Sequence, residues 1–571
     1  MKKNKLFFAF AIGLLLTFSN CETLDLDQTE NPNVPTIDQL DPEFVFNSVQ
    51  IQFAGFIGAA NGFTQDMVRQ TAMTGGGNYT SAYEPVNFNG VWSSAYGLLR
   101  NIKAMEPKAQ ETNLTYHLGA SKVMKAYTMI TLVDIFGDVP YSEALLGLEN
   151  LNPKFDSDEE VYKAALTEID AAIEILSLTP SKYPRQDLYY GTNLGSDAET
   201  QSKWITLAKT LKLKALNTAR LSGSALGLNI SNEINTLITE NDLIDTIEED
   251  FNFRYSSNRL NPDSRHPDYA LCYENNAQIG GFYLGNYFMW TMVTEKGITD
   301  PRAPYFIYRQ AATSTTADIF TLGCNFQPRP AHYNSSTYAS FYNSATLAPF
   351  CVARTNGYWG RDHGDNGGIP PDNRRRAVYG SYPVGGKFDA GEATHVQNNG
   401  EDGARGAGIL PILLSSYVYF MKAEAILTAG VSGDARVELE NAIRASFAKT
   451  SGFGGSPMIV GSAIDNYVDI VMSGGSLNPT RGYDDLDNTG KLEIIMKEFY
   501  IAAWGNGIEP YNNYRRTGYP SNMQPTLLPI SGDYFYSAFY PVNSITTNTN
   551  APTSNLRTRK TFWQPEGLNL H

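Results

Sequence analysis

The sequence predicts an all-α fold in which a scaffold of paired helices carries one long, loop-rich insert. Apolar residues recur at three- and four-residue steps from about 42 to 250 and again from about 410 to 510. Between these parts, from about 251 to 409, Gly, Pro, Asn, Tyr and Arg dominate and the helical period is lost. The chain has 571 residues and 42% hydrophobic composition, which is enough for a large buried core.

The first 20 residues have the pattern of a signal peptide. Three lysines precede an apolar run from Leu6 to Phe18, which is too short to cross a bilayer as a helix. Cys21 follows three residues later and resembles the processing site of bacterial lipoproteins, where the thiol is acylated. We therefore expect a lipid anchor on Cys21, and an ordinary secreted protein is the alternative.

An acidic tether is expected to follow this cysteine. Residues 21–41 are polar, contain prolines, and carry Glu22, Asp25, Asp27 and Glu30. Such a stretch resembles the surface-export signal of some bacterial lipoproteins, and it would be an extended, solvated linker in any case.

The net charge of the whole chain is −15. Nucleic-acid binding needs clustered Lys and Arg to neutralise phosphates, so the composition argues against that class of partner. The one dense basic run, Arg374 to Arg376, follows two prolines and is interpreted as the edge of a loop.

The first part of the scaffold shows its helices through apolar spacing and end signals. One helix includes Val91 to Met105, and a longer one covers about Leu114 to Phe136 and stops at Gly137. Ser157, spaced as a capping box with Glu160, begins the next helix. A further helix runs from about Thr200 to Leu221. Small residues at the expected contacts favour stacked hairpins of the tetratricopeptide type.

The second part of the scaffold follows the insert. We expect helices over Ile412–Ala429, Ala435–Thr450 and Lys491–Trp504. Within the insert, one short helix is expected around Phe282–Lys296. The last segment, Pro510–His571, is rich in Pro, Asn and Thr and is predicted to be an ordered loop.

Cysteine spacing indicates no zinc site. Cys272, Cys324 and Cys351 remain after Cys21, and three thiols cannot all pair. A disulfide between Cys324 and Cys351 stays open, because nothing in the sequence demonstrates it.

Two stretches of the sequence are candidates for a calcium site. Asp485, Asp487 and Thr489, followed by Gly490, resemble the opening of a calcium loop, but Met496 stands where a bidentate Glu is required. We interpret this stretch as a helix-entry turn. Asp362, Asp365 and Asn366 are the other candidates, with a hydrogen-bonded loop as the alternative. The sequence predicts neither a metal nor a cofactor.

Five stretches resemble the SusD/RagB family of nutrient-binding outer-membrane lipoproteins. One of them, Gly137 to Ala144, reads Gly-Asp-Val-Pro-Tyr-Ser-Glu-Ala. In chain order the stretches are Asn31–Thr36, Asp134–Ala144, Gly360–Asp372 with Tyr382–Asp389, Met421–Ala425, and Lys497–Phe499 with Tyr514–Pro520.

This resemblance implies a SusD-like fold for residues 42–571 as a single domain, with tetratricopeptide-like helix pairs and an irregular insert. It also implies an outer-membrane lipoprotein that sits on a SusC-like, TonB-dependent barrel. Most motif residues are expected to be structural. Glu424 should pair inside the scaffold, while Arg515 and Arg516 should tie helix ends to loops.

Ligand contacts are expected from aromatic residues in irregular segments, because flat rings stack on sugars or peptides while polar groups fix orientation. Packing of the insert against the helices is the alternative role for each, whereas Trp92, Trp204 and Trp504 lie on apolar helical faces and are assigned to the core. The candidate ligand-binding residues are Asn78, Tyr79, Tyr83, Tyr283, Tyr287, Trp290, Tyr358, Trp359 and Arg361.

No catalytic motif is present. Glycoside hydrolysis needs two carboxylates across a cleft, and no pattern marks such a pair among the 59 acidic residues. We therefore expect a binding lipoprotein that captures an oligosaccharide or other nutrient for its transporter. An oligopeptide ligand and a secreted all-helical hydrolase are the alternatives.

Overall fold

The computed structural model describes residues 41–72, 83–191, 197–273, 283–309, 358, 360–364, 377, 379–386, 403–474, 482–526, 534–552, 558–568 and 570. Pro42–His571 forms one compact unit. The predicted signal peptide, Cys21 and most of the tether lie outside the described residues, as do Cys324 and Cys351.

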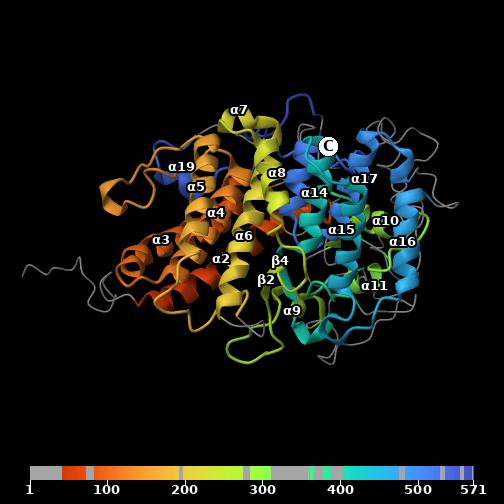
Figure 1. Cartoon of the computed structure of the whole chain (residues 1–571), viewed down its shortest axis with the longest axis horizontal. Coiled ribbons are helices and arrows are strands. Elements are labelled where there is room, and N and C mark those ends of the chain that lie inside the picture. The colour runs from red at the N-terminus through yellow and green to blue at the C-terminus, as the bar shows by residue number, and fades with distance from the viewer. Residues whose placement is uncertain are drawn as a thin grey trace, which may run out of the picture. The chain divides into compact units, whose positions relative to one another are not determined.

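The first part of the scaffold consists of long helices that pack in chain order (Figure 1). Each of α2 to α5 contacts the next helix, and α6 contacts α8. Their bounds are α2 (Pro42–Met67), α3 (Asn89–Glu111), α4 (Thr115–Phe136), α5 (Asp158–Leu176), α6 (Asp197–Thr218), α7 (Gly223–Leu226) and α8 (Ile230–Glu240). This order is that of stacked helical hairpins.

Helix ends in this part follow the local signals in the sequence. The Ser157 hydroxyl accepts a hydrogen bond from the backbone N–H of Glu160 at 3.3 Å and caps α5. Gly137 ends α4 with φ of +78°, a backbone conformation that residues other than glycine rarely adopt. Both predicted boundaries are confirmed.

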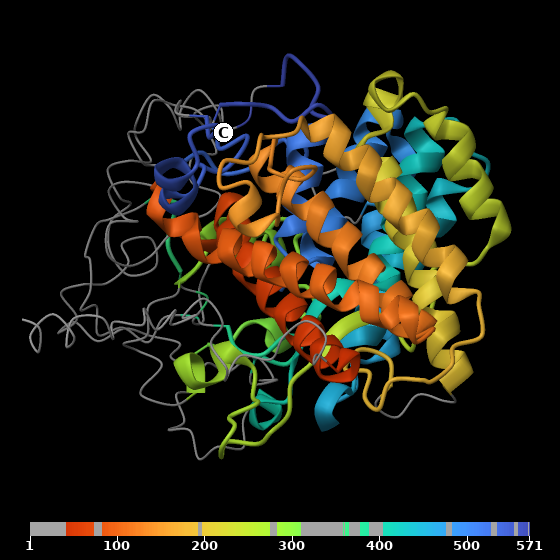
Figure 2. The same ribbon diagram turned by 90° about the vertical axis from the view of Figure 1, so that its left-hand side faces the viewer.

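The second part of the scaffold packs back on the first. Helix α14 contacts α15, α17 and α6, and α18 contacts both α17 and α2. Figures 1 and 2 show these blue and cyan helices beside the orange and yellow ones. The bounds are α14 (Ser415–Thr428), α15 (Ala435–Thr450), α16 (Gly461–Ser473), α17 (Asn488–Ala502), α18 (Ile508–Thr517) and α19 (Val542–Thr547).

Two small sheets hold the described parts of the insert. Strand β2 (Phe251–Arg254) pairs antiparallel with β4 (Ile409–Leu413), so the two ends of the insert meet. Strand β1 (Thr71–Ala72) pairs antiparallel with β3 (Tyr283–Leu284) and ties the insert to the end of α2. The short helices between them are α9 (Pro267–Tyr273), α10 (Asn286–Val293) and α11 (Ala303–Phe306).

Several elements differ from the sequence-based predictions. The helix expected from Ile412 begins at Ser415, because the preceding residues form β4, where Pro411 and pairing with β2 favour an extended backbone. Helices α8 and α16 were not predicted. The segment from Pro510, expected to be loop, contains α18 and α19.

Helix α18 was missed because its composition is polar although it is buried. Asn512 donates to Asp134 at 2.7 Å, and Arg515 donates to the backbone oxygens of Asp134 and Tyr536 at 2.6 Å. Arg516 forms an ion pair with Glu424. The expected pairing of Glu424 and the expected role of Arg515 between helix ends and a loop are thus confirmed, whereas Arg516 contacts a residue within helix α14 rather than a loop. These contacts satisfy polar groups that would be costly to bury alone.

One continuous apolar core joins both parts of the scaffold, and the mainly helical fold class is confirmed. Trp204 and Trp504 are buried in this core, and Trp92 packs against it half-buried. Within the described segments, no helix combines the length and apolar character needed to span a membrane.

Candidate functional site

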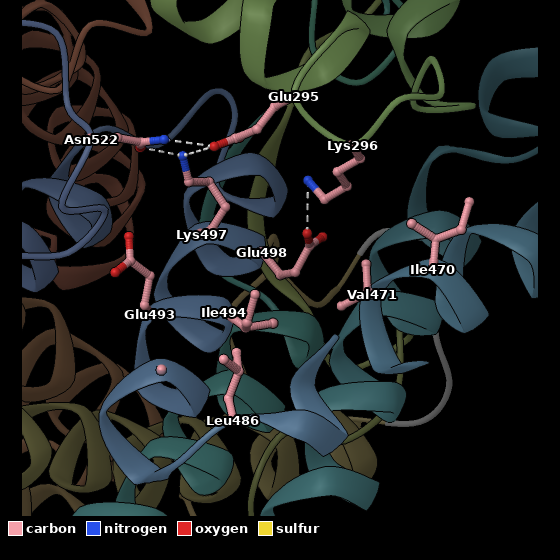
Figure 3. A pocket seen from close by; sticks show the side chains of 11 residues that line it. Glu295, Lys296, Ile470, Val471, Leu486, Glu493, Ile494, Lys497, Glu498 and Asn522 are labelled. Atoms are coloured by element: carbon pink, nitrogen blue, oxygen red, sulfur yellow. Dashed lines mark hydrogen bonds and ion pairs between the residues drawn. The ribbon is translucent and has the colours of Figure 1, made fainter. Parts of the chain in front are cut away.

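A cavity of about 330 Å³ lies between α16, α17 and the turn that follows α10 (Figure 3). Its volume is within the range of small-ligand pockets. The described residues that line it are Glu295, Lys296, Ile470, Val471, Leu486, Gly490, Glu493, Ile494, Lys497, Glu498 and Asn522.

Helix α17 supplies one complete wall of this cavity. Gly490, Ile494 and Lys497 follow one another at steps of four and three residues, so they share a face of the helix. The Asp487 carboxylate accepts a hydrogen bond from the Gly490 N–H at 2.9 Å and caps the helix. The stretch that resembled a calcium loop is therefore the predicted helix-entry turn.

The charged edge of the cavity is centred on Lys497. Its ammonium group donates to Glu295 Oε1 at 2.8 Å, Asn522 Oδ1 at 2.7 Å and the Tyr287 hydroxyl at 2.8 Å. Asn522 also donates to Glu295 Oε1 at 2.8 Å. Burial lowers the pKa of Lys497, and the Glu295 carboxylate opposes that shift. Figure 3 shows the side chains of Lys497, Glu295 and Asn522 converging.

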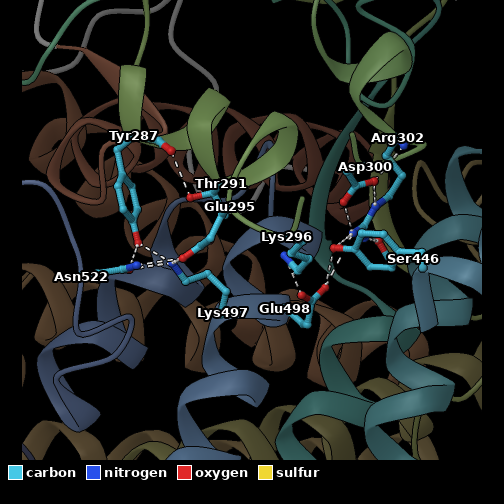
Figure 4. A network of polar contacts seen from close by, with 11 residues as sticks. Tyr287, Thr291, Glu295, Lys296, Asp300, Arg302, Ser446, Lys497, Glu498 and Asn522 are labelled. Atoms are coloured by element: carbon cyan, nitrogen blue, oxygen red, sulfur yellow. Dashed lines mark hydrogen bonds and ion pairs between the residues drawn. The ribbon is translucent and has the colours of Figure 1, made fainter. Parts of the chain in front are cut away.

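A second ion pair, between Lys296 and Glu498, lies at the other end of the same charged edge (Figure 4). Lys296 Nζ lies 2.9 Å from Glu498 Oε1, and the Tyr467 hydroxyl donates to Glu498 Oε2 at 2.9 Å. Behind them, Arg302 makes a two-pronged contact with Asp300 at 3.0 and 2.7 Å. Although burial opposes the shift, the Arg302 guanidinium lowers the pKa of Asp300.

The remaining walls are aliphatic. Ile470 and Val471 come from α16, Leu486 from the turn before α17, and Ile494 from α17. The cavity can therefore pack apolar groups of a small molecule and hold polar groups at one edge. Such a combination is typical of binding sites in which few polar groups fix the orientation of the ligand.

The predicted residues Tyr287 and Trp290 lie behind this charged edge. Tyr287 is buried, and its hydroxyl donates to Asn522 Oδ1 at 2.8 Å. The Lys497 ammonium lies 5.0 Å from the Tyr287 ring centroid and 5.6 Å from that of Trp290, which is half-buried. Both rings thus support Lys497 by cation–π contact in this structure.

The predicted residues Tyr283, Tyr358 and Arg361 are buried near the β1–β3 sheet. The Arg361 guanidinium lies 4.8 Å from the Tyr283 ring centroid. The backbone N–H of Arg361 donates to the backbone oxygen of Leu284 at 3.0 Å. Tyr358 packs under Arg309 at 4.7 Å. The structure therefore brings Tyr283 and Arg361 together but places neither in the cavity lining.

The early-loop candidates are described only in part. Tyr83 is half-buried, and its hydroxyl donates to the Asp66 carboxylate, which also accepts from Thr71 at 2.5 Å. Burial raises the pKa of Asp66 to about 6. Asn78 and Tyr79, like Trp359 of the third group, lie outside the described residues.

The second calcium candidate is also described in part. Asp362 Oδ1 accepts hydrogen bonds from Asn286 and Gln524, each at 2.7 Å, as the hydrogen-bonded alternative predicts. Asp365 and Asn366 lie outside the described residues. Among the residues that are described, no group of three His, Cys, Asp or Glu side chains could hold a metal ion.

Sequence reasoning missed Glu295, Asn522 and the role of Lys497 at the cavity. Lys497 was noted only as part of a family motif. The i, i+4 spacing of Glu493 and Lys497 on α17 was a weak signal, since such pairs are common on exposed helix faces. Glu295 and Asn522 come from distant segments, so only the folded chain shows that they meet.

Two family models match most of the chain. Residues 33–349 match a SusD-like model described as starch-binding and associating with the outer membrane. Residues 407–535 match the model of SusD and RagB outer membrane lipoproteins. No curated protein sequence matches this chain.

Solved structures show the same fold. A SusD homologue from Bacteroides fragilis is 18% identical with a TM-score of 0.63, over 93% of this chain and 100% of that one. One from Bacteroides uniformis is 16% identical with a TM-score of 0.63, over 92% and 100%.

A chitin-binding SusD homologue from Flavobacterium johnsoniae is 17% identical with a TM-score of 0.63, and the match covers 92% of this chain and 98% of that one. The solved structures confirm the predicted fold. The family models confirm the outer-membrane localisation that the sequence motifs predicted. Since the first family model alone spans more than half of the sequence, the chain belongs to the SusD-like family of outer membrane lipoproteins.

Proposed function

We propose that this protein captures an oligosaccharide or another nutrient at the cell surface and delivers it to a SusC-like, TonB-dependent transporter. Membership of a family described as starch-binding and associated with the outer membrane carries this proposal. The existence of a chitin-binding homologue with the same fold supports a glycan as the ligand. An acylated Cys21 would keep the protein beside its transporter.

The geometry of the cavity supports binding rather than catalysis. Glu295 and Glu498 are each ion-paired with a lysine, so among the described lining residues they do not form a free pair of carboxyls. Glycoside hydrolysis requires one carboxyl as proton donor and a second as base or nucleophile. A role without chemistry therefore fits this site better than the hydrolase alternative.

An affinity screen tests the proposal. The chain from residue 22 onward is titrated with soluble glycans and with oligopeptides while the solution is assayed for cleavage products. We expect heat or retardation with at least one glycan and no product. Reproducible product formation would refute the binding-only function, and binding of peptides alone would favour the oligopeptide alternative.

Two variants test the predicted aromatic contacts. Tyr79→Ala and Trp290→Ala should weaken glycan binding by about tenfold each if their rings stack on the ligand. Phe44→Ala is the control, because Phe44 is exposed on the outer face of α2. Normal binding by both variants would remove these residues from the site without affecting the proposed function.

Co-purification tests the partner. The SusC-like protein encoded in the same organism is solubilised from outer membranes that contain the tagged lipoprotein. We expect the two to elute together, and a Cys21→Ser variant should be recovered in the soluble fraction. Elution without any barrel protein would contradict delivery to such a transporter.

A further inference from the structure

The cavity beside α17 is nearly neutral although five charged side chains line it. Lys497 pairs with Glu295 at 2.8 Å, and Lys296 pairs with Glu498 at 2.9 Å. The remaining charge, Glu493, accepts hydrogen bonds from the N–H and hydroxyl of Ser521 at 3.1 and 2.6 Å. An anionic ligand would enter without a counter-ion, because both lysines are already paired, and this is costly in a site with apolar walls.

The aliphatic walls of the cavity favour methyl and short branched groups over flat rings. Ile470, Val471, Leu486 and Ile494 are aliphatic, and no aromatic side chain occurs among the described residues of the lining. Flat sugar rings bind best against aromatic faces. Methyl and short branched groups pack well against Ile, Val and Leu, and their burial favours binding.

The polar edge offers one unused acceptor. Glu295 Oε1 accepts from Lys497 and Asn522, while Oε2 is buried and accepts no hydrogen bond from the described residues. A buried acceptor without a partner is destabilising. A ligand N–H or O–H could satisfy Oε2 after a small rotation of the carboxylate toward the cavity.

We propose that this cavity binds a neutral secondary amide with a short aliphatic group, as found in N-acetylated sugars. The methyl group would pack against the aliphatic walls, and the amide N–H would donate to Glu295 Oε2. This inference rests on the proposed nutrient-binding function and adds a preference for an acetamido group. The same chemistry occurs in peptides, so the test includes a peptide-like amide.

Affinities for matched small ligands test the preference. N-acetylglucosamine, glucosamine and glucose differ only at one substituent, which is an acetamido, an ammonium or a hydroxyl group. We expect N-acetylglucosamine to bind at least about tenfold more tightly than the other two. Equal affinities for the three sugars would overturn the inference.

Two cavity-filling variants locate the binding. Leu486→Phe and Ile470→Phe enter the cavity from different walls, and both positions are half-buried, which leaves room for the ring. Each should weaken N-acetylglucosamine binding by about tenfold or more. The matched control is Leu492→Phe on α17, which does not line the cavity and should leave affinity within about twofold. Melting curves establish that each variant is folded.

The outcomes separate this inference from the proposed function. Unchanged binding of N-acetylglucosamine in both filled variants would overturn the site, even where longer glycans still bind and the nutrient-binding function stands. Binding of N-acetylalanine methylamide alone would support the amide chemistry and assign it to a peptide. If no saccharide and no amide binds, both proposals fail.

Discussion

Lys497 shows how a single buried charge can organise a site. Its side chain is 8% exposed and depends on three acceptors, of which Glu295 carries the opposite charge. Replacing the ammonium by an apolar group of similar length would leave the Glu295 carboxylate buried without its counter-ion.

We therefore expect Lys497→Met to lower the free energy of unfolding by about 3–5 kcal/mol in urea titrations. The double variant Lys497→Met/Glu295→Gln should lose less than Lys497→Met alone, because it removes both charges. Equal losses in the single and double variants would show that the unpaired Glu295 carboxylate is not the source of the destabilisation.

The raised pKa of Asp66 predicts how the stability of the folded protein depends on pH. Burial raises its folded-state pKa to about 6, above the value near 4 expected in the unfolded chain. The folded state then holds a proton that the unfolded state has lost, so the stabilising effect of the neutral carboxyl declines as pH rises from about 4 to 6.

Chemical denaturation at several pH values measures this effect against Asp66→Asn, whose side chain stays neutral. Relative to that variant, we expect the wild type to lose stability between about pH 4 and 6 and to change little above that. A constant difference across this range would contradict the raised pKa.

At the scale of single elements, helix caps were the most readable feature of the sequence. Ser157 caps α5 through Glu160, and α15 has the predicted bounds, Ala435 to Thr450. Ser157→Ala should lower the free energy of unfolding by about 1 kcal/mol, because one N–H at the helix start loses its acceptor.

The control for the cap is Ser202→Ala, at an exposed position within α6. It should change stability by less than about 0.5 kcal/mol in the same thermal or urea unfolding experiment. An equal effect of both substitutions would mean that loss of a serine, rather than of the cap, is responsible.

Across the whole molecule, Glu424 connects helices from both sides of the insert. Its carboxylate on α14 pairs with Arg516 of α18, lies 2.9 Å from Arg220 after α6, and accepts from Asn217 at 2.8 Å. Three segments far apart in sequence thus depend on one buried acid.

Glu424→Ala should destabilise the protein by about 3–5 kcal/mol, since two buried guanidinium groups lose their counter-ion. Hydrogen exchange should accelerate in both α6 and α18. Glu440→Gln, which removes a partly exposed acid that contacts Arg436 and Arg444 on α15, should cost less than about 1 kcal/mol. Faster exchange in only one of the two helices would contradict the proposed connection.

The sequence by itself determined the helical class, the extent of most long helices and the family motifs. These depend on local patterns, such as the apolar spacing that places α4 within one residue of its predicted start and at its predicted end. Local patterns failed where burial or pairing was decided by distant residues, as in β4, which pairs with β2, and in α18, whose polar residues are buried against α4 and α14.

Only the tertiary structure decided the candidate site. Glu295, Lys497 and Asn522 belong to three separate segments and form one polar edge because α10, α17 and the turn after α18 pack together. It also decided that Tyr287 supports Lys497 rather than lining the cavity. A side chain's role depends on which neighbours desolvate it and which partners reach it, and neither is set by its own position in the sequence.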